Sequence, residues 1–211
     1  VIITVWKRPY LSRQIESLIN QTLQPKGIWI VHNENYIQIR DVVDTFLKRY
    51  PNIFIIDSDL NLKYFGRFSL CHMVDTPYVQ VIDDDVIPGV EWLQTCVEKC
   101  LEYQAVVSCS GRLIRPGNFR PEEILPTDDM QKTHMNYFIG DCYNNLKYNY
   151  SPADSYVDYG CNSYFFKTEW ISSFWSVWPF TFDPGEDIHL SATLKIVRDI
   201  PTVVPKQTSI K

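Results

Sequence analysis

Three short apolar runs, separated by two helix-type patterns, constrain the fold of this chain most strongly. Residues 1–5, 28–31 and 53–56 are rich in Val and Ile and too short to form free-standing helices. Between them, residues 11–21 and 42–50 repeat apolar side chains at helical spacing. Because β-α-β-α-β chains form parallel sheets with helical crossovers, we expect an α/β fold with a mostly parallel central sheet and helices on both faces.

A fourth apolar run, residues 78–82, leads directly into three carboxylates, Asp83, Asp84 and Asp85. In an extended backbone Asp83 and Asp85 share one face. Adjacent carboxylates raise one another's pKa unless a cation or strong donors lie near, and Mg²⁺ or Mn²⁺ suits such an oxygen-rich site. Open α/β sheets bind ligands at the carboxyl ends of their strands, so we expect a divalent-cation site here. The alternative is a solvated acidic turn.

The rest of the chain is less regular. With 211 residues it fits one domain of good size. Residues 112–158 show no clear period and are rich in Pro, Asn and Tyr, which favours a partly ordered segment that faces the substrate. Further elements are expected as helices at 66–74, 90–101 and 183–196 and as strands at 105–109, 159–167 and 200–204.

The composition narrows the class of partner. The net charge of −5 argues against nucleic acid or an anionic membrane as the main partner. No apolar run reaches the length of a membrane span, and the six cysteines, which lack zinc-ligand spacing, are expected to be reduced, as in the cytoplasm. Aromatic residues make up 14%, which suits stacking on sugars or bases and equally a Tyr-rich core or interface.

Four stretches, in order along the chain, resemble motifs of the GT-A glycosyltransferases, in particular the inverting group that uses nucleotide-diphosphate sugars. Residues 4–9 (TVWKRP) resemble the segment that lines the nucleotide, and residues 17–22 (SLINQT) resemble the family's "SL..QT" pattern. Residues 83–85 (DDD) look like the metal-binding DXD motif, and residues 185–187 (GED) look like the late acidic motif that supplies the catalytic base. Each motif is weak alone, but their order and spacing make the set fairly specific.

The resemblance covers most of the chain. It implies a single Rossmann-like GT-A domain over residues 1–211, with a nucleotide-sugar-binding half at 1–111 and an acceptor-binding half at 112–211. Since the chain begins within a strand pattern, we expect it to be part of a longer multidomain protein. The N-terminal transferase domain of a chlorella-virus multidomain protein is similar in layout.

The resemblance also implies individual roles. Asp85 would bind a Mn²⁺ or Mg²⁺ ion that bridges both phosphates, Asp83 would contact the donor's ribose and serve as a second metal ligand, and Asp84 would assist. Such an ion neutralises the leaving diphosphate as a Lewis acid. Arg can pair with phosphate oxygens through two bonds. The other residues expected to contact the nucleotide or its diphosphate are Thr4, Trp6, Arg8, Asn33, Asn61, Lys63 and Arg67.

For several of these residues a structural role is the alternative. Arg8 and Lys63 could be surface charges on loops, and Asn61 could serve as a turn residue. Relatives often carry an Asp after the second strand that reads the uracil edge, whereas this chain has His, Asn and Glu at residues 32–34. The identity of the base therefore stays open, with uridine favoured.

Asp187 is the preferred general base, with Glu186 as the second candidate. An ordinary helix start would explain Asp183 as N-cap and Pro184 as the first helical residue, but it would give no structural reason for an Asp at position 187. The helix dipole would lower the pKa of Asp187, which would make it an ionised but weak base. His189 could be a third metal ligand or a hydrogen-bonded helix histidine.

These features support a metal-dependent glycosyltransferase that moves a sugar from a UDP-sugar to a glycan or other hydroxyl acceptor with inversion. A sugar-phosphate nucleotidyltransferase is a second hypothesis, although residues 6–9 lack the Gly-rich phosphate loop that such enzymes use. A third is a non-catalytic module that binds nucleotides or carbohydrates.

Overall fold

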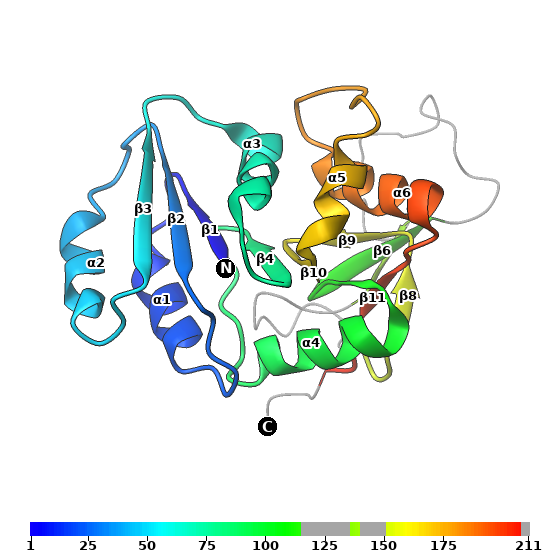
Figure 1. Ribbon diagram of the computed structural model, residues 1–211, viewed down its shortest axis with the longest axis horizontal. Coiled ribbons are helices and arrows are strands. Elements are labelled where there is room, and N and C mark those ends of the chain that lie inside the picture. The colour runs from blue at the N-terminus through cyan, green and yellow to red at the C-terminus, as the bar shows by residue number, and fades with distance from the viewer. Residues whose placement is uncertain (115–135, 140–150, 208–211) are drawn as a thin grey trace, which may run out of the picture.

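A computed structural model describes residues 1–114, 136–139 and 151–207, with residues 136–139 described by their backbone alone. Within these residues the core is an eight-stranded sheet in the order β3-β2-β1-β4-β10-β5-β11-β8, beside a three-stranded sheet in the order β7-β6-β9 (Figure 1). The strands are β1 (Ile2–Val5), β2 (Ile28–Asn33), β3 (Ile53–Ser58), β4 (Tyr78–Ile82), β5 (Val106–Val107), β6 (Ser110–Ile114), β7 (Asn136–Ile139), β8 (Ser155–Val157), β9 (Tyr159–Cys161), β10 (Ser163–Lys167) and β11 (Thr202–Val204). The helices are α1 (Leu11–Ile19), α2 (Arg40–Leu47), α3 (Lys63–Ser69), η1 (Leu70–Met73), α4 (Trp92–Tyr103), η3 (Thr168–Trp170), α5 (Ile171–Phe174) and α6 (Glu186–Arg198).

The first half of the chain has the predicted alternation. β1 pairs in parallel with both β2 and β4, and β2 pairs in parallel with β3. The central strands carry apolar residues on both faces, and Ile3, Ile30 and Val81 are completely buried. Because parallel strands of this kind need cover on both faces, the helices flank the sheet as expected. The prediction of an α/β fold with a mostly parallel central sheet is confirmed.

The expected strand at 159–167 is two strands in two different sheets. The chain bends at Asn162, whose φ of 67° is one that Asn tolerates better than most residues. β9 joins the small sheet, and β10 pairs antiparallel with β4 in the main sheet. Gly160 lies so close to Ser108 that an added Cβ would be 2.6 Å from the Ser108 Cβ. Its small size therefore serves packing between the strands.

The expectation that 112–158 is irregular throughout is wrong for the described parts. β6 ends at Ile114, β7 covers Asn136–Ile139 and β8 covers Ser155–Val157. These strands are too short for a period of two to stand out between Pro and polar residues. Residues 115–135 and 140–150 lie outside the described residues, so a substrate-facing role for them stays a prediction.

The last helix begins later than expected. α6 starts at Glu186, and Gly185, with a φ of 133°, precedes it without any side-chain cap. The capping role expected for Asp183 is therefore wrong, because its carboxylate instead pairs with Lys63 Nζ at 2.9 Å. No helix among the described residues is long and apolar enough to cross a membrane. Cys71, Cys96 and Cys100 are buried and form no disulfide, while Cys142 lies outside the described residues.

Candidate active site

A buried glutamine on α1 shapes the acidic turn that follows β4. The Nε2 of Gln14 donates to the carbonyl oxygens of Asp83 and Val86, at 2.8 Å each. Gln14 is completely buried. Sequence reasoning missed it, although a polar side chain between Leu11 and Leu18 on the apolar face of a helix was the available signal. The carboxylates of the turn are thus held by a fixed backbone and not by a loose loop.

Arg67 connects this turn to the start of α6. Its guanidinium contacts the carboxylate of Asp83 through Nη1, and its Nη2 donates to Glu186 Oε1 at 2.9 Å. Its side chain is only 4% exposed. Burial alone would lower the pKa of Arg67, but the carboxylates of Asp83 and Glu186 raise it overall, so Arg67 stays charged. Arg67 was expected to meet the donor's diphosphate or its base, whereas in this structure its partners are two protein carboxylates.

Asp85 has the features of a cation ligand. Its side chain is 8% exposed, and its Oδ2 contacts the guanidinium of Arg8. Its Oδ1 is buried and has no hydrogen-bond partner within the described part of the chain. A buried carboxylate oxygen without a donor is costly, and a hard divalent cation would satisfy it. The residues present therefore fit Mg²⁺ or Mn²⁺, which Asp85 would hold.

Arg8 stands where such a cation would be needed. Its Nη1 lies 3.5 Å from Asp84 Oδ1 and also contacts Asp85, while half of its own side chain is exposed. Burial raises the pKa of Asp84, the Arg8 charge opposes that effect and the negative charge of Asp83 adds to it. Because the Arg8 side chain is half exposed, it can move aside for an ion or pair with a phosphate. The geometry is therefore compatible with Arg8 as a contact of the diphosphate and equally with Arg8 as a surface charge.

Asp187 lies in the first turn of α6 with its carboxylate half buried. Its Oδ1 accepts from the Ile188 backbone N–H at 2.7 Å, and its Oδ2 lies 4.0 Å from Cys161 Sγ. Burial raises the pKa of Asp187, and the charge of Asp83 raises it further, against the effect of its backbone hydrogen bonds. The expectation of a lowered pKa is therefore wrong, because desolvation outweighs the helix terminus. A raised pKa makes Asp187 a stronger base.

Glu186 is engaged elsewhere. It accepts from Arg67, and its Oε2 accepts from the Gly185 N–H at 3.1 Å. Burial raises the pKa of Glu186, while the Arg67 charge opposes that shift. With both oxygens bonded, Glu186 suits a structural role better than proton transfer. This contrast favours Asp187 as the base.

His189 does not point toward the acidic turn. Its Nε2 lies 2.9 Å from the Phe174 carbonyl oxygen, and its ring packs against those of Phe65 and Phe174. Among the residues described, no three His, Cys, Asp or Glu side chains converge on one point that could hold a metal ion. The alternative of a hydrogen-bonded helix histidine describes its position in this structure.

The ends of β1 and β2 form an aromatic and charged rim. Trp6 Nε1 donates to Glu34 Oε2 at 2.8 Å, and its ring meets that of Tyr36 edge-on at 5.7 Å. Lys7 Nζ lies 3.9 Å from the Trp6 ring centroid and 4.4 Å from that of Tyr36. Thr4 lies in β1, paired with Val31. Sequence reasoning had named Trp6 and Thr4, had included Lys7 only as part of the stretch 4–9, and had missed Tyr36.

Three other residues predicted to contact the donor form hydrogen bonds or ion pairs within the protein. Asn33 is 3% exposed, and its Oδ1 accepts from the Leu62 N–H at 3.1 Å, which joins the end of β2 to the start of α3. Asn61 Oδ1 accepts from the Lys63 N–H at 2.8 Å, the turn chemistry that was the alternative for it. Lys63 itself pairs with Asp183.

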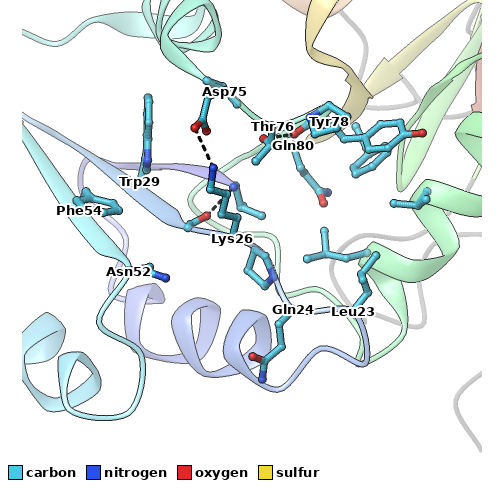
Figure 2. Close-up of a pocket in the computed structure, with 18 of the residues that line it drawn as sticks. Leu23, Gln24, Lys26, Trp29, Asn52, Phe54, Asp75, Thr76, Tyr78 and Gln80 are labelled. Atoms are coloured by element: carbon cyan, nitrogen blue, oxygen red, sulfur yellow. Dashed lines mark hydrogen bonds and ion pairs between the residues drawn. The ribbon is translucent and has the colours of Figure 1, made fainter.

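A cavity of about 760 Å³ lies near the starts of β2, β3 and β4 (Figure 2), and none of these residues lines it. It is lined by residues that begin strands, including Trp29, Phe54 and Tyr78, and Lys26 pairs with Asp75 beside it at 2.8 Å. The acidic turn follows the other end of β4. The cavity therefore contains none of the predicted site residues, despite its size.

Comparison with known proteins identifies the family. Residues 1–168 match the family described as Glycosyl transferase family 2, a match that ends before Glu186 and Asp187. No curated protein matches the chain.

Solved structures of TarS from S. aureus are similar in fold. A TarS crystal structure gives a TM-score of 0.61 at 13% identity, covering 99% of this chain and 35% of that one. A structure of TarS 1–349 gives 0.58 at 16% identity, covering 99% of this chain and 58% of that one. TarS 1–349 in complex with UDP gives 0.59 at 15% identity, covering 99% and 57%. The chain thus spans about a third of the longer TarS chain and somewhat over half of the shorter one.

The match over residues 1–168 covers most of the 211 residues, and the sheet order agrees with a GT-A fold. The chain therefore belongs to glycosyl transferase family 2.

Proposed function

We propose that this domain transfers a sugar from a nucleotide-diphosphate donor, with UDP as the favoured nucleotide, to a hydroxyl group of a glycan or other acceptor, in a metal-dependent reaction with inversion. The observation that carries the proposal is the Arg67 bridge, which ties the acidic turn after β4 to the first turn of α6. It keeps a cation-seeking carboxylate, Asp85, and a basic carboxylate, Asp187, within one rigid framework.

The donor assignment rests on family membership and on the rim at the ends of β1 and β2. The TarS 1–349 complex contains UDP, which makes UDP the first nucleotide to test. The rings of Trp6 and Tyr36 offer an aromatic surface to a base, and Lys7 and Arg8 supply positive charge to an otherwise acidic protein. Residues 32–34 stand where relatives often carry an Asp that reads uracil. His32 is already bonded to Asp57 and to the Ile37 carbonyl oxygen, so a contact with the base would come from other residues of this rim.

Asp85 would hold the Mn²⁺ or Mg²⁺ ion, with Asp83 and Asp84 close by. When bound, the ion would neutralise negative charge on the leaving diphosphate. Asp83 is paired with Arg67, so its carboxylate is better placed to orient the donor than to serve as a second full ligand. Arg8 would pair with phosphate oxygens once it leaves Asp85.

Asp187 would accept the proton of the acceptor hydroxyl while that oxygen forms a bond to the anomeric carbon. The bond from this carbon to the diphosphate oxygen breaks on the opposite face, and the electron pair leaves with the nucleoside diphosphate. Attack opposite the leaving group inverts the anomeric configuration. The raised pKa of Asp187 makes it suited to this proton transfer.

A panel of nucleotide sugars tests the proposal. Purified protein is incubated with UDP-, GDP- and CMP-sugars, with Mn²⁺ or with chelator, and release of free nucleotide is measured. Metal-dependent release of UDP from a UDP-sugar is expected, and NMR of the product gives the anomer. Release of inorganic pyrophosphate from a sugar phosphate and a nucleoside triphosphate would instead support the nucleotidyltransferase, and no release from any donor would support a non-catalytic module.

We also propose that the domain acts in the cytoplasm within a longer multidomain protein and does not bind nucleic acid.

A further inference from the structure

Three aromatic side chains in the loop between α5 and α6 lie exposed beside the candidate active site. Trp178 is 81% exposed, Phe182 is 45% exposed and Phe180 is fully exposed. Figure 1 shows this loop projecting from the molecule next to α3. Large aromatic rings kept in water forgo the free energy of burial, and exposed apolar groups that gather in one place mark sites for ligands or partners.

A chain of ring contacts fixes the loop to the catalytic framework. Trp178 meets Phe182 edge-on with 5.4 Å between ring centroids, and Phe182 meets Phe65 on α3 in the same way at 5.4 Å. Phe65 lies two residues before Arg67, which contacts both Asp83 and Glu186. Trp178 and Phe182 are therefore positioned by the same helix that supports the acidic turn.

The loop also runs directly into the proposed base. Asp183 pairs with Lys63 of α3 at 2.9 Å, and two residues later Gly185 turns the chain with a φ of 133° into α6, whose second residue is Asp187. The Lys63–Asp183 pair leaves the loop without net charge. An aromatic surface without net charge next to a base is poorly suited to a phosphate and well suited to the C–H face of a sugar ring.

We propose that Trp178 and Phe180, with Phe182 packed behind Trp178, form an aromatic platform that stacks on a sugar ring of the acceptor, so that the acceptor is a saccharide. This inference rests on the proposed function and narrows its acceptor from any hydroxyl compound to a saccharide. Phe182 is a positioning residue, since its ring is held between those of Trp178 and Phe65.

Saturation-transfer NMR tests the platform without knowledge of the natural acceptor. The probes are the methyl glycosides of glucose, galactose, mannose and N-acetylglucosamine, each added to protein with UDP and Mn²⁺. At least one glycoside is expected to show saturation of its ring protons, and Trp178→Ala is expected to weaken its binding about tenfold. Trp178→Phe should keep most of the binding. Phe54→Ala, which removes a 51%-exposed ring on β3, is the matched control and should leave it unchanged.

UDP binding, measured by calorimetry on the same samples, separates the two proposals. If UDP binds and no glycoside binds, or if Trp178→Ala and Phe54→Ala affect glycoside binding equally, the platform is overturned while the proposed function stands. Self-association of the protein that Trp178→Ala abolishes, without glycoside binding, would assign the rings to a protein interface and also overturn it. Failure of every nucleotide sugar to release nucleotide would count against the proposed function itself.

Discussion

Arg67 and Glu186 form a buried ion pair between residues that are 119 positions apart in the sequence, with Nη2 of Arg67 2.9 Å from Oε1 of Glu186. The two side chains are 4% and 8% exposed. Because Arg67 also contacts Asp83, one guanidinium fixes the end of β4 relative to the start of α6. The pair is thus the physical link between the donor side and the proposed base.

Replacing Arg67 should break the link between the end of β4 and the start of α6 and so destabilise the protein. Arg67→Met leaves the carboxylates of Asp83 and Glu186 near each other without their cation, and removal of one partner of a buried pair typically costs about 3–5 kcal/mol. Chemical denaturation measures this loss. The control is Lys26→Met, which breaks an exposed pair with Asp75 and should cost far less, because water screens such a pair. Equal stability of the two variants would show that the Arg67 bridge does not stabilise the fold.

Gln14 should contribute to the stability of the fold through its two buried hydrogen bonds. Gln14→Leu removes the donor for the carbonyl oxygens of Asp83 and Val86 and should cost about 1–3 kcal/mol. Gln24→Leu is the matched control, because Gln24 is exposed and, among the described residues, donates to the Ile19 carbonyl oxygen alone. Thermal unfolding compares them. A Gln14→Leu protein as stable as the Gln24→Leu protein would contradict this role.

Asp85 should control metal-dependent nucleotide binding. Asp85→Asn keeps the size of the side chain but removes the charge that a divalent cation needs, so the affinity for UDP in the presence of Mn²⁺ should fall by about 10- to 100-fold or more. Calorimetry with Mn²⁺ and with chelator measures it. Asp75→Asn, at an exposed carboxylate that lines the cavity near the start of β4, should leave the affinity unchanged. Unchanged Mn²⁺ dependence in Asp85→Asn would place the cation elsewhere.

The pH dependence of transfer should reflect the environment of Asp187. Burial and then the Asp83 charge raise the pKa of Asp187, and only its ionised form can accept a proton. Activity should therefore rise with pH through that raised pKa, so the acid limb of kcat/KM should lie above the value of about 3.9 for a free Asp. UDP release at saturating Mn²⁺ measures the limb. A limb at or below the value for a free Asp would mean that the group responsible is solvated.

Much of the fold could be predicted because its signals are local. The apolar runs of β1 to β4 and the helical spacing of α1 and α2 fixed the parallel part of the sheet, and the three carboxylates marked its ligand-binding end. The later strands could not be predicted as well. The change from β9 to β10 depends on one residue in a left-handed conformation, Asn162, and the pairing of β10 with β4 is a contact between distant segments.

The site was predicted by residue type more than by role. Asp83, Asp85 and Asp187 were named, and the structure links the elements that carry them. Arg67 was named as a contact of the diphosphate or the base, but its burial between two carboxylates is a tertiary property that no spacing reveals. The rise in the pKa of Asp187 likewise follows from burial, whereas the sequence showed only a carboxylate in the first turn of a helix.

The central claim, that Asp187 accepts the acceptor's proton, is tested most directly by Asp187→Asn. The variant should bind UDP with Mn²⁺ as the unaltered protein does, while its rate of sugar transfer should fall by about 10²- to 10⁴-fold, the usual contribution of a general base. Asp183→Asn, an exposed carboxylate four residues earlier, is the control and should lose far less. Transfer by Asp187→Asn within a few-fold of the unaltered rate would contradict the account and move the base to another group.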